Sequence, residues 1–102
     1  MQYQQPKSEK NWDINKMYRR FETAIEARKL IDDLGDQLKQ VNYNKDLYKL
    51  VANCNKLVNA LSSAEVNARQ QHKPNIVNKP REELANAIDY AEKMLIIAKL
   101  SM

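Results

Sequence analysis

The chain has 102 residues, of which 43% are hydrophobic, and a formal net charge of +4 at pH 7. This length corresponds to one domain, and a single glycine with three prolines argues against a β-fold built on tight hairpin turns. The longest apolar run, residues 94–98, excludes a membrane span, which needs about twenty residues. The single cysteine excludes an internal disulfide.

The N-terminal segment is polar and shows no periodicity. We expect residues 1–12 to form a flexible tail ahead of a single domain over residues 13–102. The tail has neither the apolar stretch nor the cleavage site of a secretory signal. A cytoplasmic protein is therefore the expectation.

The first apolar row predicts a helix over residues 13–41, with Asp13 as its N-cap. Gly35 lies inside this helix, where it either admits a closely packed neighbouring helix or marks a bend. The apolar residues that recur at helical spacing are Ile14, Met17, Tyr18, Phe21, Ile25, Ile31, Leu34, Leu38 and Val41.

The second predicted helix, residues 45–72, carries the clearest pattern in the chain. Its apolar residues are three and four positions apart and share one helical face: Leu47, Leu50, Val51, Cys54, Leu57, Val58 and Leu61. Asn44 is expected to cap this helix. Because Ser62-Ser63-Ala64-Glu65 has the spacing of a capping box, the helix either continues to residue 72 or breaks at Ser62-Ser63.

The third predicted helix spans residues 80–101, after Pro74 has ended the second one. Pro80 suits the first helical position, where its missing N–H costs nothing. The inward row of this helix is Leu84, Ile88, Ala91, Leu95 and Ala98. Short connections make consecutive helices antiparallel neighbours. The fold class is therefore all-α: an antiparallel up-down bundle of three long helices, or of four if the second breaks.

Antiparallel packing would gather cationic side chains at one end of the bundle, which we term the basic pole. Its predicted members are Lys16, Arg19, Arg20, Arg69, Lys73, Lys79 and Arg81. This modest patch suggests an anionic partner such as nucleic acid, with ordinary surface solubility as the alternative interpretation. On exposed helix faces we also expect i,i+4 ion pairs, among them Glu65–Arg69 and Asp89–Lys93.

The opposite end of the bundle carries more apolar side chains than a three-helix core requires. The predicted protein interface there consists of Tyr43, Tyr48, Met94, Ile96 and Ile97. Such a surface indicates a binding partner, either a second copy or another protein, unless a fourth element of the same chain covers it.

No pattern of residues indicates catalysis or a metal ion. The only histidine, His72, precedes Lys73-Pro74 at a helix end, a position typical of a helix-dipole partner. The acidic cluster around Asp32 and Asp36 has cations one turn away, and one glycine cannot build a phosphate-binding loop. We therefore expect no enzyme activity, no cofactor, no metal ion and no small-molecule substrate.

The sequence thus predicts a small non-enzymatic helical module that self-associates or binds another macromolecule. Two alternatives remain open. The first is a nucleic-acid-associated accessory protein that uses the basic pole. The second is a bundle of the bacteriocin-immunity type, which the chain resembles only in length, basicity and helical class, with no motif in support.

Overall fold

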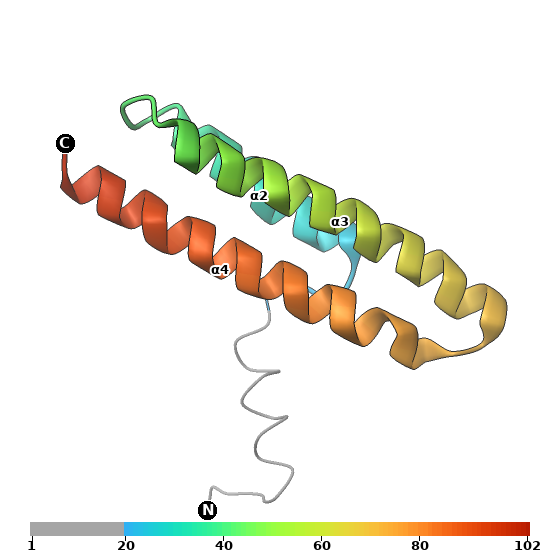
Figure 1. The fold of residues 1–102 in the computed structure, drawn as a ribbon. Helices are drawn as coiled ribbons and strands as arrows, with labels where there is room; N and C mark the ends of the chain where they lie inside the picture. The colour runs from blue at the N-terminus through green and yellow to red at the C-terminus, as the bar shows by residue number, and fades with distance from the viewer. Residues whose placement is uncertain (1–19) are drawn as a thin grey trace, which may run out of the picture.

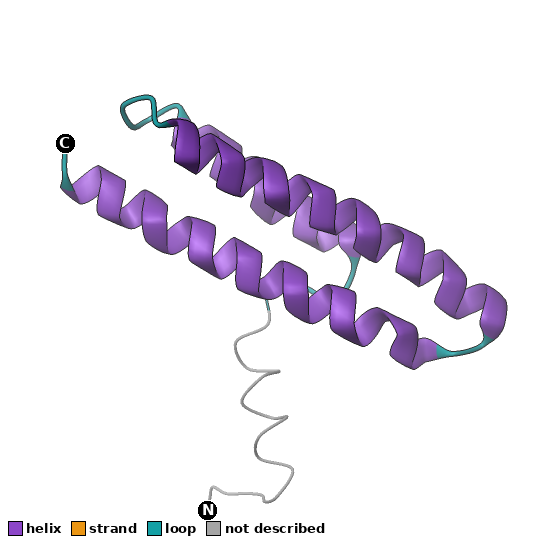
Figure 2. Ribbon diagram, viewed as in Figure 1, coloured by secondary structure: helices purple, strands orange, loops and turns teal. Residues whose placement is uncertain are grey.

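The computed structural model describes residues 20–102, and this part of the chain forms three α-helices and one short 3-10 helix (Figures 1 and 2). Helix α2 spans Ala24–Leu38, α3 spans Lys45–Gln71, η1 spans Pro74–Val77 and α4 spans Asn78–Leu100. Helix α3 runs antiparallel to both α2 and α4 (Figure 1). The all-α antiparallel bundle predicted from the sequence is confirmed, in its three-helix form.

Helix α3 is the central helix, since it packs more extensively against α2 and against α4 than these two helices pack against each other. Its residues Cys54, Val58 and Leu61 have no exposed surface. They belong to one hydrophobic core with fully buried leucines from the neighbouring helices, among them Leu34 of α2 and Leu84 of α4. The buried residues of the described chain are all apolar, so the core is held together by the hydrophobic effect and close packing.

The alternative break at Ser62-Ser63 does not occur, because α3 is continuous from Lys45 to Gln71. Buried Ala64 and Ala68 extend the apolar row past the serines. The carboxylate of Glu65 turns to the neighbouring helix, where it accepts a hydrogen bond of 2.9 Å from the backbone N–H of Ala24. Glu65, the acidic residue of the predicted capping box, therefore makes a contact between α3 and α2 and does not cap a new helix.

The predicted start of the first helix lies outside the described residues, as do its proposed cap Asp13 and the expected tail over residues 1–12. Within the described chain, the prediction of one continuous helix over residues 13–41 is wrong, because residues 20–23 are not helical. Thr23 is the N-cap of α2 and forms a capping box with Glu26. The hydroxyl of Thr23 accepts from the N–H of Glu26 at 3.3 Å, and the Glu26 carboxylate accepts from the N–H of Thr23 at 3.1 Å.

The inward face of α2 also differs from the predicted row. Ile25 is 71% exposed, whereas Ala24 and Ala27 are 2% and 0% exposed. The helix ends at Leu38, so Val41 lies half-buried in the turn that follows. A Cβ atom added at Gly35 would meet no atom within 4 Å. Of the two alternatives for this glycine, a closely packed neighbouring helix is therefore excluded.

The connection between α3 and α4 is tight and partly buried. His72 caps α3 with a left-handed backbone (φ 55°), and the N–H of Lys73 donates to the carbonyl of Ala68 at 3.0 Å. Val77 of η1 packs into the core. Helix α4 begins at Asn78 rather than at Pro80, because proline is tolerated throughout the first turn, whose N–H groups lack partners. None of the helices within residues 20–102 has the length and apolar character needed to cross a membrane.

Replacing Gly35 by alanine should stabilise the protein by about 0.5–1 kcal/mol, because alanine is the better helix former and the added methyl group meets open space. Guanidinium unfolding followed by circular dichroism measures this gain. Ala52→Gly, an exposed change in the interior of α3, is the reciprocal control and should cost a similar amount. Destabilisation by Gly35→Ala would reveal a close contact at this position.

The start of α2 should be sensitive to acid. Hydrogen bonds from the backbone N–H groups of Glu22 and Thr23 lower the pKa of Glu26 below its ordinary value of 4.5. A carboxyl group whose pKa is lowered by folding stabilises the protein above its unfolded pKa, and this contribution disappears as the pH falls through the folded value. We therefore expect Glu26→Gln to lower the melting temperature at pH 7, and the gap to wild type to close below pH 4.5.

Glu83→Gln provides the control, since the side chain of Glu83 is exposed and has no hydrogen bond to another described residue. Thermal melts of the three proteins between neutral pH and the acid range test the expectation. A gap between Glu26→Gln and wild type that stayed constant on acidification would contradict a role for the ionised carboxylate.

Candidate functional site

The basic pole is only partly assembled. Lys16 and Arg19 lie outside the described residues. Arg20 is tied to the middle of α4, where its guanidinium lies 2.6 Å from the carboxylate of Glu92 and 3.9 Å from that of Asp89. Arg20 therefore does not contribute a free charge to the end of the bundle.

The remaining predicted members of the pole lie around the connection between α3 and α4. Lys73 and Lys79 are exposed, and Arg69 and Arg81 line a shallow depression between the start of α2 and the α3–α4 connection. Acidic Glu22 and Glu65 line the same depression, and the guanidinium of Arg81 donates to the carbonyl of Glu22 at 3.0 Å. The depression therefore carries mixed charges, which is not the concentrated positive field that phosphate groups require.

The predicted protein interface divides into separate parts. Tyr43 and Tyr48, at the start of α3, pack their rings with centroids 5.2 Å apart and planes inclined by 36°. Both tyrosines are exposed, at 75% and 44%. They form a small aromatic pair beside the α2–α3 turn.

The residues predicted from α4 point in different directions. Ile96 is 56% and Ile97 49% exposed, and successive helical residues are about 100° apart, so these two side chains lie on different sides of α4. Met94 is half-buried against the core. Leu100 and Tyr90, which are 81% and 53% exposed, were not among the predicted interface residues. Ile96 and Leu100 share one side of α4, and Tyr90, Met94 and Ile97 share another.

Helix α2 covers only one side of the α3–α4 pair. Polar contacts locate that side: the Arg28 guanidinium of α2 donates to the side-chain oxygen of Asn59 at 3.2 Å, and the Lys99 ammonium donates to Gln37 at 3.0 Å. The other side of the pair is mostly apolar along both helices, and we term this face the α3–α4 seam. The seam consists of Leu50, Leu57 and Ala60 from α3, with the polar Asn53 between the two leucines, and of Ala87, Tyr90, Met94 and Ile97 from α4.

The two halves of the seam lie next to each other. The short connection between residues 71 and 78 sets the antiparallel register, which places Leu57 level with Tyr90 and Leu50 level with Ile97. Leu50, Leu57 and Met94 are half-buried against the core, whereas Tyr90 and Ile97 are exposed. The predicted core row of α3 includes Leu50 and Leu57, whereas the structure leaves both leucines only half-buried.

The chemistry available at these surfaces is limited. No group of three or more histidine, cysteine or acidic residues within the described chain could hold a metal ion. His72 is exposed at the end of α3, and Asp33 accepts a hydrogen bond of 2.8 Å from the side chain of Gln37. The Cys54 thiol is fully buried, and burial raises its pKa from 9.0 to about 11, which makes it a poor nucleophile. No protein-family model, curated protein or solved structure matches the chain.

Cys54 should resist modification while the protein is folded. The rise of its pKa from 9.0 to about 11 lowers the thiolate fraction at pH 8 about a hundredfold, and the thiol has no exposed surface. With a chromogenic disulfide reagent we expect slow labelling of the native protein and immediate labelling in concentrated guanidinium chloride. Rapid labelling of the native protein would show that the centre of the bundle opens readily.

Proposed function

We propose that this protein is a non-enzymatic protein-interaction module that self-associates through apolar side chains in the C-terminal half of α4. One observation carries the proposal: Ile96 and Leu100, which lie one turn apart on the same side of α4, are 56% and 81% exposed. Scattered apolar residues are normal on a protein surface, but a contiguous group is typical of an interface. Burying it would contribute about 25 cal/mol for each Å² of apolar area.

Nucleic-acid binding at the basic pole has weaker support. Arg20 is paired with Glu92, and Glu22 and Glu65 lie beside Arg69 and Arg81 in the depression at the pole. A protein that binds nucleic acid through phosphate contacts presents cations without such neutralising partners. We therefore favour a protein partner over a nucleic acid.

Light scattering coupled to size exclusion, over a wide range of protein concentration, tests the proposal. We expect the apparent mass of the wild type to rise with concentration. The double variant Ile96→Lys and Leu100→Lys should remain a monomer, because both changes place a charge in the apolar group. Circular dichroism should show unchanged helix content, since both side chains are exposed.

Ile25→Lys is the matched control. Ile25 is 71% exposed, and it lies in the first turn of α2, at the opposite end of the bundle from Leu100. This variant should self-associate as the wild type does. A wild-type protein that stays monomeric at every concentration would overturn self-association, and equal loss in Ile25→Lys would show that α4 is not the surface involved.

A further inference from the structure

We propose that the α3–α4 seam binds one amphipathic helix with acidic flanks, which packs as a fourth helix beside α3 and α4. This inference rests on the proposed protein-interaction function and adds the chemical character of a partner. It concerns a surface that adjoins the one we assign to self-association: Ile96 lies on another side of α4 from Tyr90 and Met94, and Leu100, three residues after Ile97, lies between the two surfaces.

The shape of the seam fits a helix. Its residues follow a 3-4-3 spacing on both α3 and α4, and two such rows side by side leave between them the ridge-and-groove pattern into which a third helix packs. From Leu50 to Ala60 the α3 row is about 15 Å long, which corresponds to almost three turns of a partner. The small, exposed Ala60 allows the backbone of a partner helix to approach α3 closely. Leu57 and Met94 are held by the core on one side, and the rest of each side chain can contact the partner.

Asn53 is the one polar residue in the α3 row of the seam. Its side chain is exposed and forms no hydrogen bond with another residue in the part of the chain that the structure describes. A single asparagine in an otherwise apolar helix interface fixes the register of the partner at some cost in affinity, because its amide needs a polar group opposite. Asn53 therefore restricts how a partner helix lies on the seam without removing the apolar contacts on either side.

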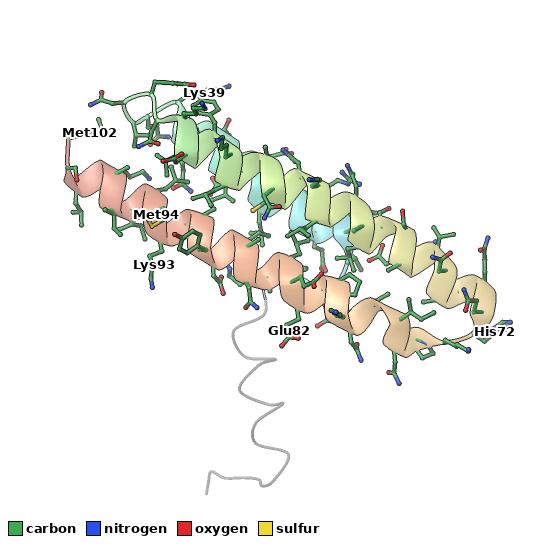
Figure 3. All side chains as sticks on the ribbon, in the orientation of Figure 1. Lys39, His72, Glu82, Lys93, Met94 and Met102 are labelled. Carbon is green, nitrogen blue, oxygen red and sulfur yellow. The ribbon has the colours of Figure 1, made fainter. Side chains whose placement is uncertain are left out.

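The charges around the seam select the partner. Lys49, Lys56 and Lys93 are exposed beside it, and none of them forms an ion pair with another residue in the described part of the chain. Lys93 points away from the bundle while its neighbour Met94 leaves α4 in another direction (Figure 3). The acid nearest to Lys93 in the sequence, Glu92, is bound to Arg20. Between the levels of Leu50 and Ala60, the rim of the seam is therefore positive, and the exposed Glu83 lies one turn before Ala87 on the same side of α4.

A positive rim favours an acidic helix and disfavours a second copy of the same face. Two seams packed against each other would bring the three lysines of one copy towards those of the other, and like charges across an interface cost binding energy. An amphipathic helix with leucines facing the seam and glutamates on its flanks would instead meet both the apolar residues and the lysines. Helix-in-groove recognition combines the same two contributions.

The test uses two designed fluorescent peptides of the same length, each with leucines at i, i+3, i+4 and i+7. One carries glutamates on both flanks and the other carries lysines. Anisotropy titrations should show binding of the acidic peptide to the wild-type protein and none of the basic peptide. The triple variant Lys49→Glu, Lys56→Glu and Lys93→Glu should weaken binding of the acidic peptide at least tenfold and should instead bind the basic peptide.

The control variant Lys29→Glu, Lys39→Glu and Lys73→Glu changes the net charge equally at exposed positions away from the seam. It should bind the acidic peptide as the wild type does. Equal weakening in both triple variants would overturn the assigned surface, since it would report net charge alone. Binding to vesicles that contain phosphatidylserine, with no binding of the acidic peptide, would overturn the inference in favour of a membrane surface.

Light scattering on the same wild-type sample separates this inference from the proposed function. Self-association without binding of the acidic peptide overturns the inference and leaves the interaction surface at Ile96 and Leu100 in place. Binding of the acidic peptide by a strictly monomeric protein supports the inference and overturns self-association.

Discussion

The bundle depends on the burial of one face of α3 beneath two shorter helices. Cys54, Val58 and Leu61 are completely buried, and that burial requires α2 on one flank and α4 on the other. Helix α3 has 27 residues, whereas α2 has 15, so α2 covers only part of the α3–α4 pair (Figure 1). The apolar residues of α3 that turn away from α2 are covered by α4 alone. This unequal coverage leaves the α3–α4 seam partly exposed.

The carboxylate of Glu65 helps to fix the residue at which α2 begins. Glu65 of α3 accepts a hydrogen bond from the N–H of Ala24, while Glu26 and Thr23 bond the neighbouring backbone groups. The first N–H groups of a helix have no partner within the helix. These side-chain acceptors supply the missing partners, and they therefore fix the boundary between the non-helical residues 20–23 and α2. A negative charge at this position also complements the positive end of the helix dipole.

The long apolar rows made the fold class and the position of α3 predictable, and they explain why Ser62-Ser63 does not interrupt the helix: Ala64 and Ala68 continue the row. The start of α2 was missed because Ile25 preserved the spacing, although Thr23 and Glu26 carry the signature of a capping box. The predicted place of Arg20 in the basic pole depended on that continuity. Surface charges were the least predictable, since an i,i+4 pair contributes only a few tenths of a kcal/mol: Glu65 binds Ala24 instead of Arg69, and Lys93 has no ion pair with a described residue.

Because i,i+4 ion pairs are weak, contacts between helices affect which surface charges remain unpaired. If Lys93 were held by Asp89, as its spacing suggests, the rim of the seam would lose one of its three positive charges that have no ion pair within the described chain and would discriminate less between partners. Asp89 lies instead 3.9 Å from the guanidinium of Arg20, on the flank of α4 that faces the start of α2. Arg20, in the non-helical segment 20–23, thus pairs with Asp89 and Glu92, and Lys93 has no ion pair with a described residue. The irregular start of α2 therefore contributes to the positive charge beside the α3–α4 seam, together with Lys49 and Lys56 of α3.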